Sequence, residues 1–172
     1  MTTPILHLLC GKIASGKSTL ARTLGSEAKT IVISEDRWLA ALYPDEIRSV
    51  SDYINRARRI RGVLEPLVIS VLSAGVSVVL DFPANTVSDR AWLRALADGA
   101  QVQNRLHFLN VDDQTCRARL RARNARGDHD FAATDKEFDL ITSYFTVPDE
   151  HCLLYTSPSP RDRSLSRMPS SA

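Results

Sequence analysis

The stretch Gly11-Lys12-Ile13-Ala14-Ser15-Gly16-Lys17-Ser18 decides the fold of this chain. It follows the apolar run Ile5–Cys10, which predicts a buried strand, and it precedes a helical pattern over Lys17–Leu24. The spacing G-x-x-x-x-G-K-[ST] between a strand and a helix is typical of a loop that binds phosphate groups. Its glycines let backbone N–H groups turn toward the phosphates, and the helix N-terminus adds the positive end of its dipole.

The side chains of this phosphate loop, residues 11–18, carry complementary chemistry. The Lys17 ammonium can reach the β- and γ-phosphates of a nucleotide, and the Ser18 hydroxyl can ligate Mg²⁺. The competing interpretation is a glycine-bearing turn with a chance lysine, which the complete motif in this context disfavours. We predict that Lys17 also acts in catalysis and that the nucleotide site comprises Gly11, Lys12, Ile13, Ala14, Ser15, Gly16, Lys17, Ser18 and Thr19.

Short apolar runs alternate with helical patterns along the rest of the chain. Nearly continuous apolar character is typical of strands that are buried on both faces. Three further strands are predicted at Thr30–Ser34, Val76–Leu80 and Arg105–Val111. This alternation of strands and helices predicts an α/β fold with a parallel sheet.

The helices between these strands are marked by their ends. Helices are predicted over residues 88–98 and 113–125, and the spacing Thr134–Glu137 predicts a capping box that begins another. The range 45–74 predicts two helices, broken near Arg61-Gly62 or at Pro66.

Two aspartates lie where predicted strands end. Asp81 follows the run 76–80, where a carboxylate can hold Mg²⁺ directly or through water; a turn aspartate beside Pro83 is the alternative. Asp36, preceded by Glu35, follows the strand 30–34, at the edge of a parallel sheet where ligands bind. Its carboxylate could accept the proton of an attacking hydroxyl, or it could cap the next helix.

Five arginines crowd one predicted helix and its exit: Arg117, Arg119, Arg121, Arg123 and Arg126. Spacings of four place Arg117 with Arg121 and Arg119 with Arg123, on different faces of the helix. We predict that Arg119, Arg123 and Arg126 belong to a lid that neutralises charge on a transferring phosphoryl group. For Arg117 and Arg121 a solvated helix face is favoured.

Other polar groups are open to two interpretations. The cluster Arg56–Arg61 could hold an anionic substrate or nucleic acid, or could be a solvated helix face. Asn85, Thr86 and Arg90 could line the substrate side of the cleft or could form an ordinary loop and helix start. His129 falls in the predicted lid without a Cys or His partner at metal-site spacing.

Length and composition restrict the class of protein. The chain has 172 residues, 44% hydrophobic and 24% charged, which indicates one globular domain. No apolar run approaches the ~20 residues of a membrane span, so a membrane protein is not expected. Three widely spaced cysteines indicate neither a disulfide framework nor a zinc site, and favour a cytoplasmic location. The sequence indicates no oligomeric state.

The segment 152–172 differs from the rest in composition. It is rich in serine and proline, and Cys152–Asp162 and Ser166–Ala172 resemble the translation of a sequencing-library adapter. We therefore expect a domain over 1–151, cut before its natural end, and a non-native disordered tail over 152–172. Residues 1–151 hold 19 basic and 19 acidic side chains, and this neutrality disfavours nucleic-acid binding.

The chain resembles the small P-loop kinases through GKIASGKS, VSVVLDFPANTVSDRAWLRAL at 76–96 and CRARLRARNARG at 116–127. That group includes gluconate and shikimate kinases, chloramphenicol phosphotransferase and zeta-toxin-like kinases. In particular, the chain resembles bacterial proteins described as AAA-type ATP-binding proteins. The resemblance covers about residues 4–151.

The resemblance implies a three-layer α/β/α P-loop NTPase fold with strand order 2-3-1-4-5, in which truncation removes the fifth strand. It implies ATP and Mg²⁺ as cofactors, an acid after the second strand as general base, matched by Asp36, and lid arginines matched best by Arg119 and Arg123. The chain is then expected to move the γ-phosphoryl of ATP to a hydroxyl of a small molecule. The alternatives are an ATP-hydrolysing switch without an acceptor and a nucleic-acid end kinase.

Overall fold

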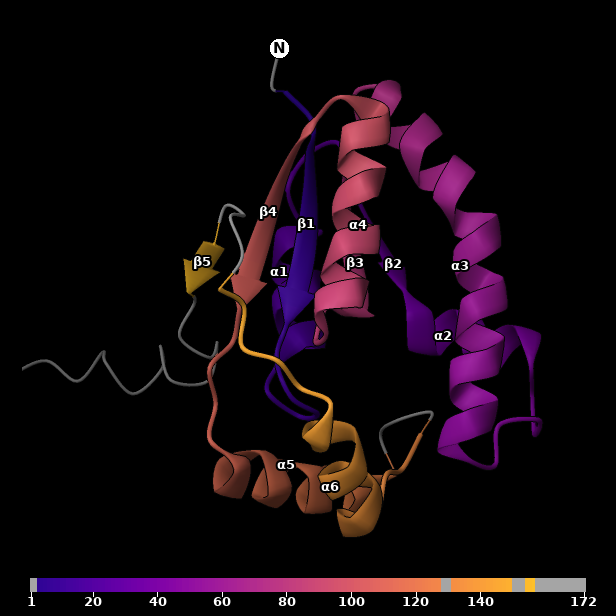
Figure 1. Cartoon of the computed structure of the whole chain (residues 1–172), viewed down its shortest axis with the longest axis vertical. Coiled ribbons are helices and arrows are strands. Elements are labelled where there is room, and N and C mark those ends of the chain that lie inside the picture. Colours follow the sequence, from indigo (N-terminus) through magenta and orange to yellow (C-terminus); the bar gives the residue numbers. More distant parts are fainter. Residues whose placement is uncertain (1–2, 128–130, 150–153, 157–172) are drawn as a thin grey trace, which may run out of the picture.

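The computed structural model describes residues 3–127, 131–149 and 154–156, in which strands and helices alternate (Figure 1). The strands are β1 Ile5–Cys10, β2 Thr30–Ser34, β3 Ser77–Pro83, β4 Gln103–Phe108 and β5 Leu154–Thr156. The helices are α1 Lys17–Leu24, α2 Glu35–Leu42, α3 Val50–Ser73, α4 Val87–Ala100, α5 Asp113–Arg126 and α6 Asp135–Ser143.

The strands form one parallel sheet in the order β2-β3-β1-β4-β5. β1 lies in the middle, with Leu6 opposite Val78 of β3 and Asn104 of β4. The predicted α/β class, the parallel pairing and the expected order 2-3-1-4 are confirmed. At the far edge, β2 leaves Ile31 and Val32 about 40% exposed, at 39% and 41%.

The fifth position of the sheet differs from the expectation of a missing strand. Three residues of the segment expected to be a non-native tail, Leu154–Thr156, pair in parallel with Leu106–Phe108 of β4. A physical reason is available, because an unpaired edge of β4 offers backbone N–H and C=O groups to any nearby extended segment. The other tail residues, 152–153 and 157–172, lie outside the described residues.

Helices cover both faces of the sheet, which gives the three layers that were expected. On one face, α3 and α4 bury the larger core, where Leu64 and Leu93 belong to the same cluster as Leu8 and Leu80 of the strands. On the other face, Leu20 and Ala21 of α1 share a smaller cluster with Leu9 and Val79. In Figure 1 α5 and α6 lie beyond the carboxyl ends of β1 and β4.

The range predicted to hold two helices contains one long helix instead. α3 runs without a break through Gly62 and Pro66. Pro66 removes one backbone hydrogen bond at a cost of about 3 kcal/mol. Four apolar side chains of α3 are buried on either side of Pro66: Ile60, Leu64, Val68 and Leu72. Because each contributes about 1.5–3 kcal/mol, their burial outweighs the local cost.

α5 and α6 form a small unit that packs against the phosphate loop. Phe138 of α6 is fully buried with Val111, Cys116 and Leu120. Ile13 and Ala14 of the phosphate loop pack against this cluster, together with Ala133. Thr134 and Glu137 form the predicted capping box at the start of α6. The unit that carries the arginines is therefore joined directly to the loop.

Two buried histidines face each other across β1 and β4. His7 Nδ1 lies 3.0 Å from His107 Nε2, the rings are stacked, and the residues are 3% and 6% exposed. Burial, with the charges of His7 and Arg105, lowers the pKa of His107 from 6.5 to about 4. Burial also lowers the pKa of His7. The fold therefore holds both rings neutral.

The histidine pair should make the protein less stable in acid. The unfolded chain binds protons below about pH 6.5, whereas the folded chain resists them until about pH 4, so stability falls as the pH drops through this window. The shift of His107 alone predicts a loss of about 2 kcal/mol between neutral pH and about pH 5. Urea unfolding at both pH values measures the loss. The double variant His7→Gln/His107→Gln should lose less, and an unchanged loss in that variant would contradict the assignment.

Candidate functional site

The phosphate loop closes around the side chain of Lys17. The Lys17 ammonium donates hydrogen bonds to the carbonyl oxygens of Gly11 at 2.7 Å and Lys12 at 2.9 Å. The loop reaches this shape through positive φ angles at Ala14, 61°, and Gly16, 107°. Gly16 is the N-cap of α1 and supplies no side-chain cap, so the first N–H groups of the helix stay available for an anion.

The start of the loop has no room for a side chain. A Cβ at Gly11 would lie 2.5 Å from Ser15 Oγ and 3.1 Å from the backbone oxygen of Leu109. The Gly11 N–H donates to Asn85 Oδ1 at 3.0 Å, which joins the loop to the end of β3. Ser15 Oγ is buried without a hydrogen-bond partner among the described residues.

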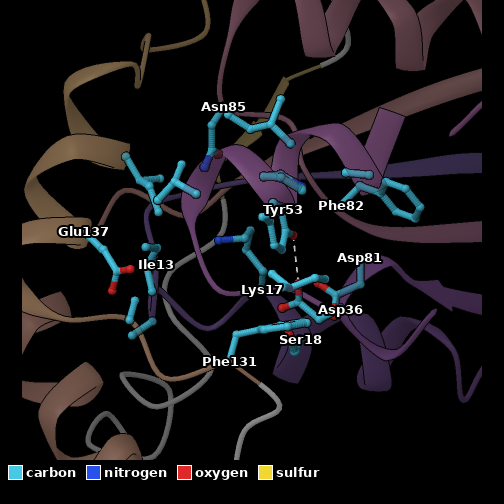
Figure 2. Close-up of a pocket in the computed structure, with 18 of the residues that line it drawn as sticks. Ile13, Lys17, Ser18, Asp36, Tyr53, Asp81, Phe82, Asn85, Phe131 and Glu137 are labelled. Carbon is cyan, nitrogen blue, oxygen red and sulfur yellow. Dashed lines mark hydrogen bonds between the residues drawn. The ribbon is translucent and has the colours of Figure 1, made fainter. Parts of the chain in front are cut away.

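The predicted carboxylates lie on the side of the cavity that faces Lys17. Asp81 pairs in register with Ser34, so Asp36 follows the neighbouring strand at nearly the same level. Burial lowers the pKa of Lys17, and the charges of Asp81 and Asp36 raise it. Figure 2 shows Lys17, Ser18, Asp36 and Asp81 around one space, and all four line a cavity of about 1150 Å³.

Asp36 does not cap a helix. α2 begins at Glu35, its N-cap is Ser34, and Asp36 lies in the first turn. Asp36 Oδ1 accepts a hydrogen bond of 2.8 Å from the Tyr53 hydroxyl, drawn as a dashed line in Figure 2. This position inside the cavity favours the chemical role for Asp36 over the capping role.

The structure divides the five arginines of α5 in two. Arg117 forms an ion pair with Asp139 and Arg121 with Asp135, so these two fasten α5 to α6. The other three, Arg119, Arg123 and Arg126, line the cavity. The spacing of four residues accounts for the pairs Arg117/Arg121 and Arg119/Arg123, which lie on different faces of α5.

The cavity arginines lie close to the phosphate loop and to Asp36. Arg119 Nη1 lies 3.5 Å from the carbonyl oxygen of Ser15. Burial lowers the pKa of Arg123, and the charge of Asp36 raises it. Arg123 Nε is buried without a hydrogen-bond partner among the described residues. A guanidinium in this state is suited to receive an anionic group.

Two of the four arginines of the second basic cluster, Arg56 and Arg61, form ion pairs within the fold, and Arg58 lines the cavity. Arg56 pairs with Glu46 at 2.8 Å and stacks on Tyr43. Arg61 pairs with Glu35 at 3.1 Å and with Asp89 at 2.7 Å, which sequence reasoning did not indicate. These ion pairs do not support the interpretation of Arg56–Arg61 as a continuous surface that binds nucleic acid.

The three polar residues after β3 have different places. Asn85 and Thr86 line the cavity, and Thr86 also caps α4 through its hydroxyl. Arg90 is buried and donates to the carbonyl oxygens of Ala84 and Thr146, so its observed role is to hold two loops together. His129 lies outside the described residues.

Sequence reasoning missed Tyr53 and Phe131. Both line the cavity, and their rings meet edge to face with centroids 5.8 Å apart. Tyr53 lies within a helix and Phe131 follows α5, so no motif links the two residues to each other or to Asp36. Only their contacts in the folded chain reveal the association.

The groups in the cavity fit a nucleotide with Mg²⁺. Ser18 and Asp81 offer the oxygen donors that Mg²⁺ prefers. No group of three or more His, Cys, Asp or Glu side chains that could hold a metal ion occurs among the described residues. Uncapped helix N–H groups and Lys17 provide complementary donors for phosphate oxygens.

Residues 6–148 match the family described as the AAA domain. The chain belongs to this family. Within the family match lie the phosphate loop, Asp36, Asp81 and the arginines of α5. A search of curated proteins found no significant match.

Solved structures share the fold at low identity. One is a protein described as a candidate kinase from Chloroflexus aurantiacus, with TM-score 0.74, 19% identity, and coverage of 95% of this chain and 89% of that chain. Another is Kti12 from Chaetomium thermophilum, solved in complex with ADP-AlF3, with TM-score 0.71, 19% identity, and coverage of 95% of this chain and 94% of that chain. A third is the APS kinase CysC of Mycobacterium tuberculosis, solved in complex with AMPPNP and APS, with TM-score 0.58, 19% identity, and coverage of 96% of this chain and 96% of that chain.

These structures confirm the expected P-loop kinase-like fold. They lie below the identity at which an activity can be transferred, so the reaction has to be argued from the site itself. Among the described residues, no helix is both long and apolar enough to span a membrane.

Gly11→Ala should weaken nucleotide binding while leaving the fold in place. The added Cβ must displace Ser15 or the loop backbone, and overpacking of about 1–3 kcal/mol at the binding loop corresponds to about 5- to 150-fold weaker binding. Titration calorimetry with ADP and Mg²⁺ measures the affinity. Gly62→Ala is the matched control, because a Cβ there meets nothing within 4 Å. Equal affinities in the two variants would contradict the assignment of this loop.

Proposed function

We propose that this protein transfers the γ-phosphoryl group of ATP to a hydroxyl of a small molecule. The observation that carries the proposal is one cavity that joins the phosphate loop to Asp36, a carboxylate in the first turn of the helix that follows β2. A phosphate site alone would suit many nucleotide-binding proteins. The added carboxylate, with space beside it, supplies a base for an acceptor.

The proposed step needs little covalent chemistry from the protein. The acceptor oxygen forms a bond to the γ-phosphorus, the bond from that phosphorus to the bridging oxygen breaks, and ADP leaves. Asp36 takes the acceptor's proton on its carboxylate. Mg²⁺, held by Ser18 and Asp81, would neutralise charge on the phosphate oxygens. Positioning and charge stabilisation then account for most of the rate.

The remaining charges would act on the transferring group. Lys17 would leave the carbonyl oxygens of Gly11 and Lys12 for the β- and γ-phosphates. Arg119, Arg123 and Arg126 would contact the phosphoryl group from the opposite wall. Arg123 Nε is buried without a hydrogen-bond partner among the described residues, so phosphate binding would offer this group a partner.

The alternatives are weaker on this geometry. An ATP-hydrolysing switch needs no space for an acceptor. The cavity does offer such space, because it extends past Asp36 to Ile54 and Arg58 of α3. A nucleic-acid end kinase needs exposed cations along a backbone path, but Arg56 and Arg61 are held by carboxylates. The acceptor is thus proposed to be a small molecule. The domain boundary at 151 and the cytoplasmic location stay predictions.

Lys17→Ala should abolish phosphoryl transfer. γ-Labelled ATP with Mg²⁺ is incubated with fractionated small metabolites, and labelled products are separated from free phosphate. Wild-type protein should yield a labelled acceptor, and Lys17→Ala should yield none. Lys136→Ala, which changes an exposed lysine of α6, is the matched control. Release of free phosphate without any labelled acceptor would favour the hydrolysing switch instead.

The two groups of arginines should differ in the same assay. Arg123→Ala should lower the transfer rate about 100- to 1000-fold, the usual effect of removing a group that stabilises developing charge. Arg117→Ala lies on the same helix and removes the ion pair with Asp139 and the stacking on Phe138, but no group that lines the cavity, so its rate should stay within about threefold. Similar losses in both variants would show that α5 acts through its folding rather than through Arg123.

A further inference from the structure

A continuous chain of hydrogen bonds leads from the start of α4 to Asp36. Arg61 Nη1 donates to Asp89 Oδ1 at 2.7 Å, and Arg61 Nε donates to Glu35 Oε1 at 3.1 Å. The Tyr53 hydroxyl lies 3.0 Å from Glu35 Oε2 and 2.8 Å from Asp36 Oδ1. This series of hydrogen bonds thus joins three helices, α2, α3 and α4, at one wall of the cavity.

Glu35 is an unusual side chain to find in this place. It is 1% exposed, and a buried carboxylate is costly unless charged or polar partners surround it. Burial raises the pKa of Glu35, whereas the Arg61 charge and the Tyr53 hydrogen bond lower it. Arg61 is itself supported by the Trp92 ring, 5.0 Å from its guanidinium carbon. Arg61 and Tyr53 therefore offset the cost of burying Glu35, and both also line the cavity.

Tyr53 carries one hydroxyl hydrogen between two carboxylate oxygens. Burial and the nearby charges of Glu35 and Asp36 raise the pKa of Tyr53 well above 10, so the phenol stays protonated at neutral pH. It can donate to only one of the two carboxylates at a time. The edge-to-face contact with Phe131 fixes the ring from the cavity side.

The geometry points to Tyr53 as a positioning residue that orients Asp36 for phosphoryl transfer, with Glu35 as its alternate hydrogen-bond acceptor. This inference rests on the proposed function. While Asp36 is charged, the Tyr53 hydrogen points to its Oδ1 and holds the plane of the carboxylate. After Asp36 takes the acceptor's proton, the same hydrogen turns to Glu35. No proton leaves Tyr53, and no buried hydroxyl loses its partner.

The coupling can be measured without any acceptor. The full chain labelled with 3-fluorotyrosine contains four tyrosines, and Tyr53→Phe identifies the ¹⁹F resonance of Tyr53. Asp36→Asn and Glu35→Gln should each move that resonance, because each changes a group bonded to the hydroxyl. The Tyr43 resonance is the internal control. A Tyr53 resonance that neither substitution moves would overturn the inference.

The kinetic test separates positioning from folding. Tyr53→Phe should lower kcat for label transfer about 10- to 100-fold, the scale of one hydrogen bond to a charged group. Affinity for ADP with Mg²⁺ should stay unchanged, because the ring still packs. The Tm should fall, because the buried Glu35 loses the Tyr53 hydrogen bond. Tyr43→Phe makes the same chemical change outside the cavity and should change neither kcat nor affinity. An unchanged kcat in Tyr53→Phe, or equal losses in the two variants, would overturn the inference.

The outcomes distinguish this inference from the proposed function. If Asp36→Asn abolishes transfer while Tyr53→Phe does not change it, the kinase proposal stands and the positioning role falls. If the wild-type chain labels no acceptor, the kinase proposal fails. In that case the ¹⁹F result still decides whether Tyr53 and Asp36 are coupled.

Discussion

The parallel pairing of β1 with both β3 and β4 is the constraint on which the rest of the structure depends. Parallel strands have their carboxyl ends at the same end of the sheet, so residues distant in sequence meet there. The phosphate loop follows β1, and Asp81 lies near the end of β3. Asp36 reaches the same end because β2 pairs with β3 in the same direction. An antiparallel strand at either position would carry its side chains to the opposite end of the molecule.

The carboxyl end of the sheet is held in shape by hydrogen bonds, ion pairs and apolar contacts between the surrounding loops and helices. Asn85 fastens the first residue of the phosphate loop to the end of β3, and Arg90 ties the following loop to Thr146. α5 and α6 are joined by the ion pairs of Arg117 and Arg121, and their apolar cluster contacts the loop at Ile13 and Ala14. The arginines that face the cavity are therefore displayed by a braced unit rather than by a free helix.

Features that depend on local order could be predicted from the sequence. The phosphate loop, four strands and the capping box at Thr134 all follow from short spacings. The prediction of two helices in the range 45–74 is wrong, because it weighed the local cost of Pro66 and not the burial of the side chains around it. Tyr53 escaped notice for a related reason. Its relation to Glu35 and Asp36 arises only when α3 packs against α2, and no spacing in the sequence encodes that contact.

The far edge of the sheet has a practical consequence. β2 pairs on one side only and exposes two β-branched residues, Ile31 and Val32, in the middle of the strand. An edge of this kind is a template on which a second chain can add a strand. We therefore expect association at high protein concentration to proceed through β2, which Lys29 precedes by one residue in the sequence. A lysine introduced at position 31 would act as a gatekeeper far from the nucleotide cavity.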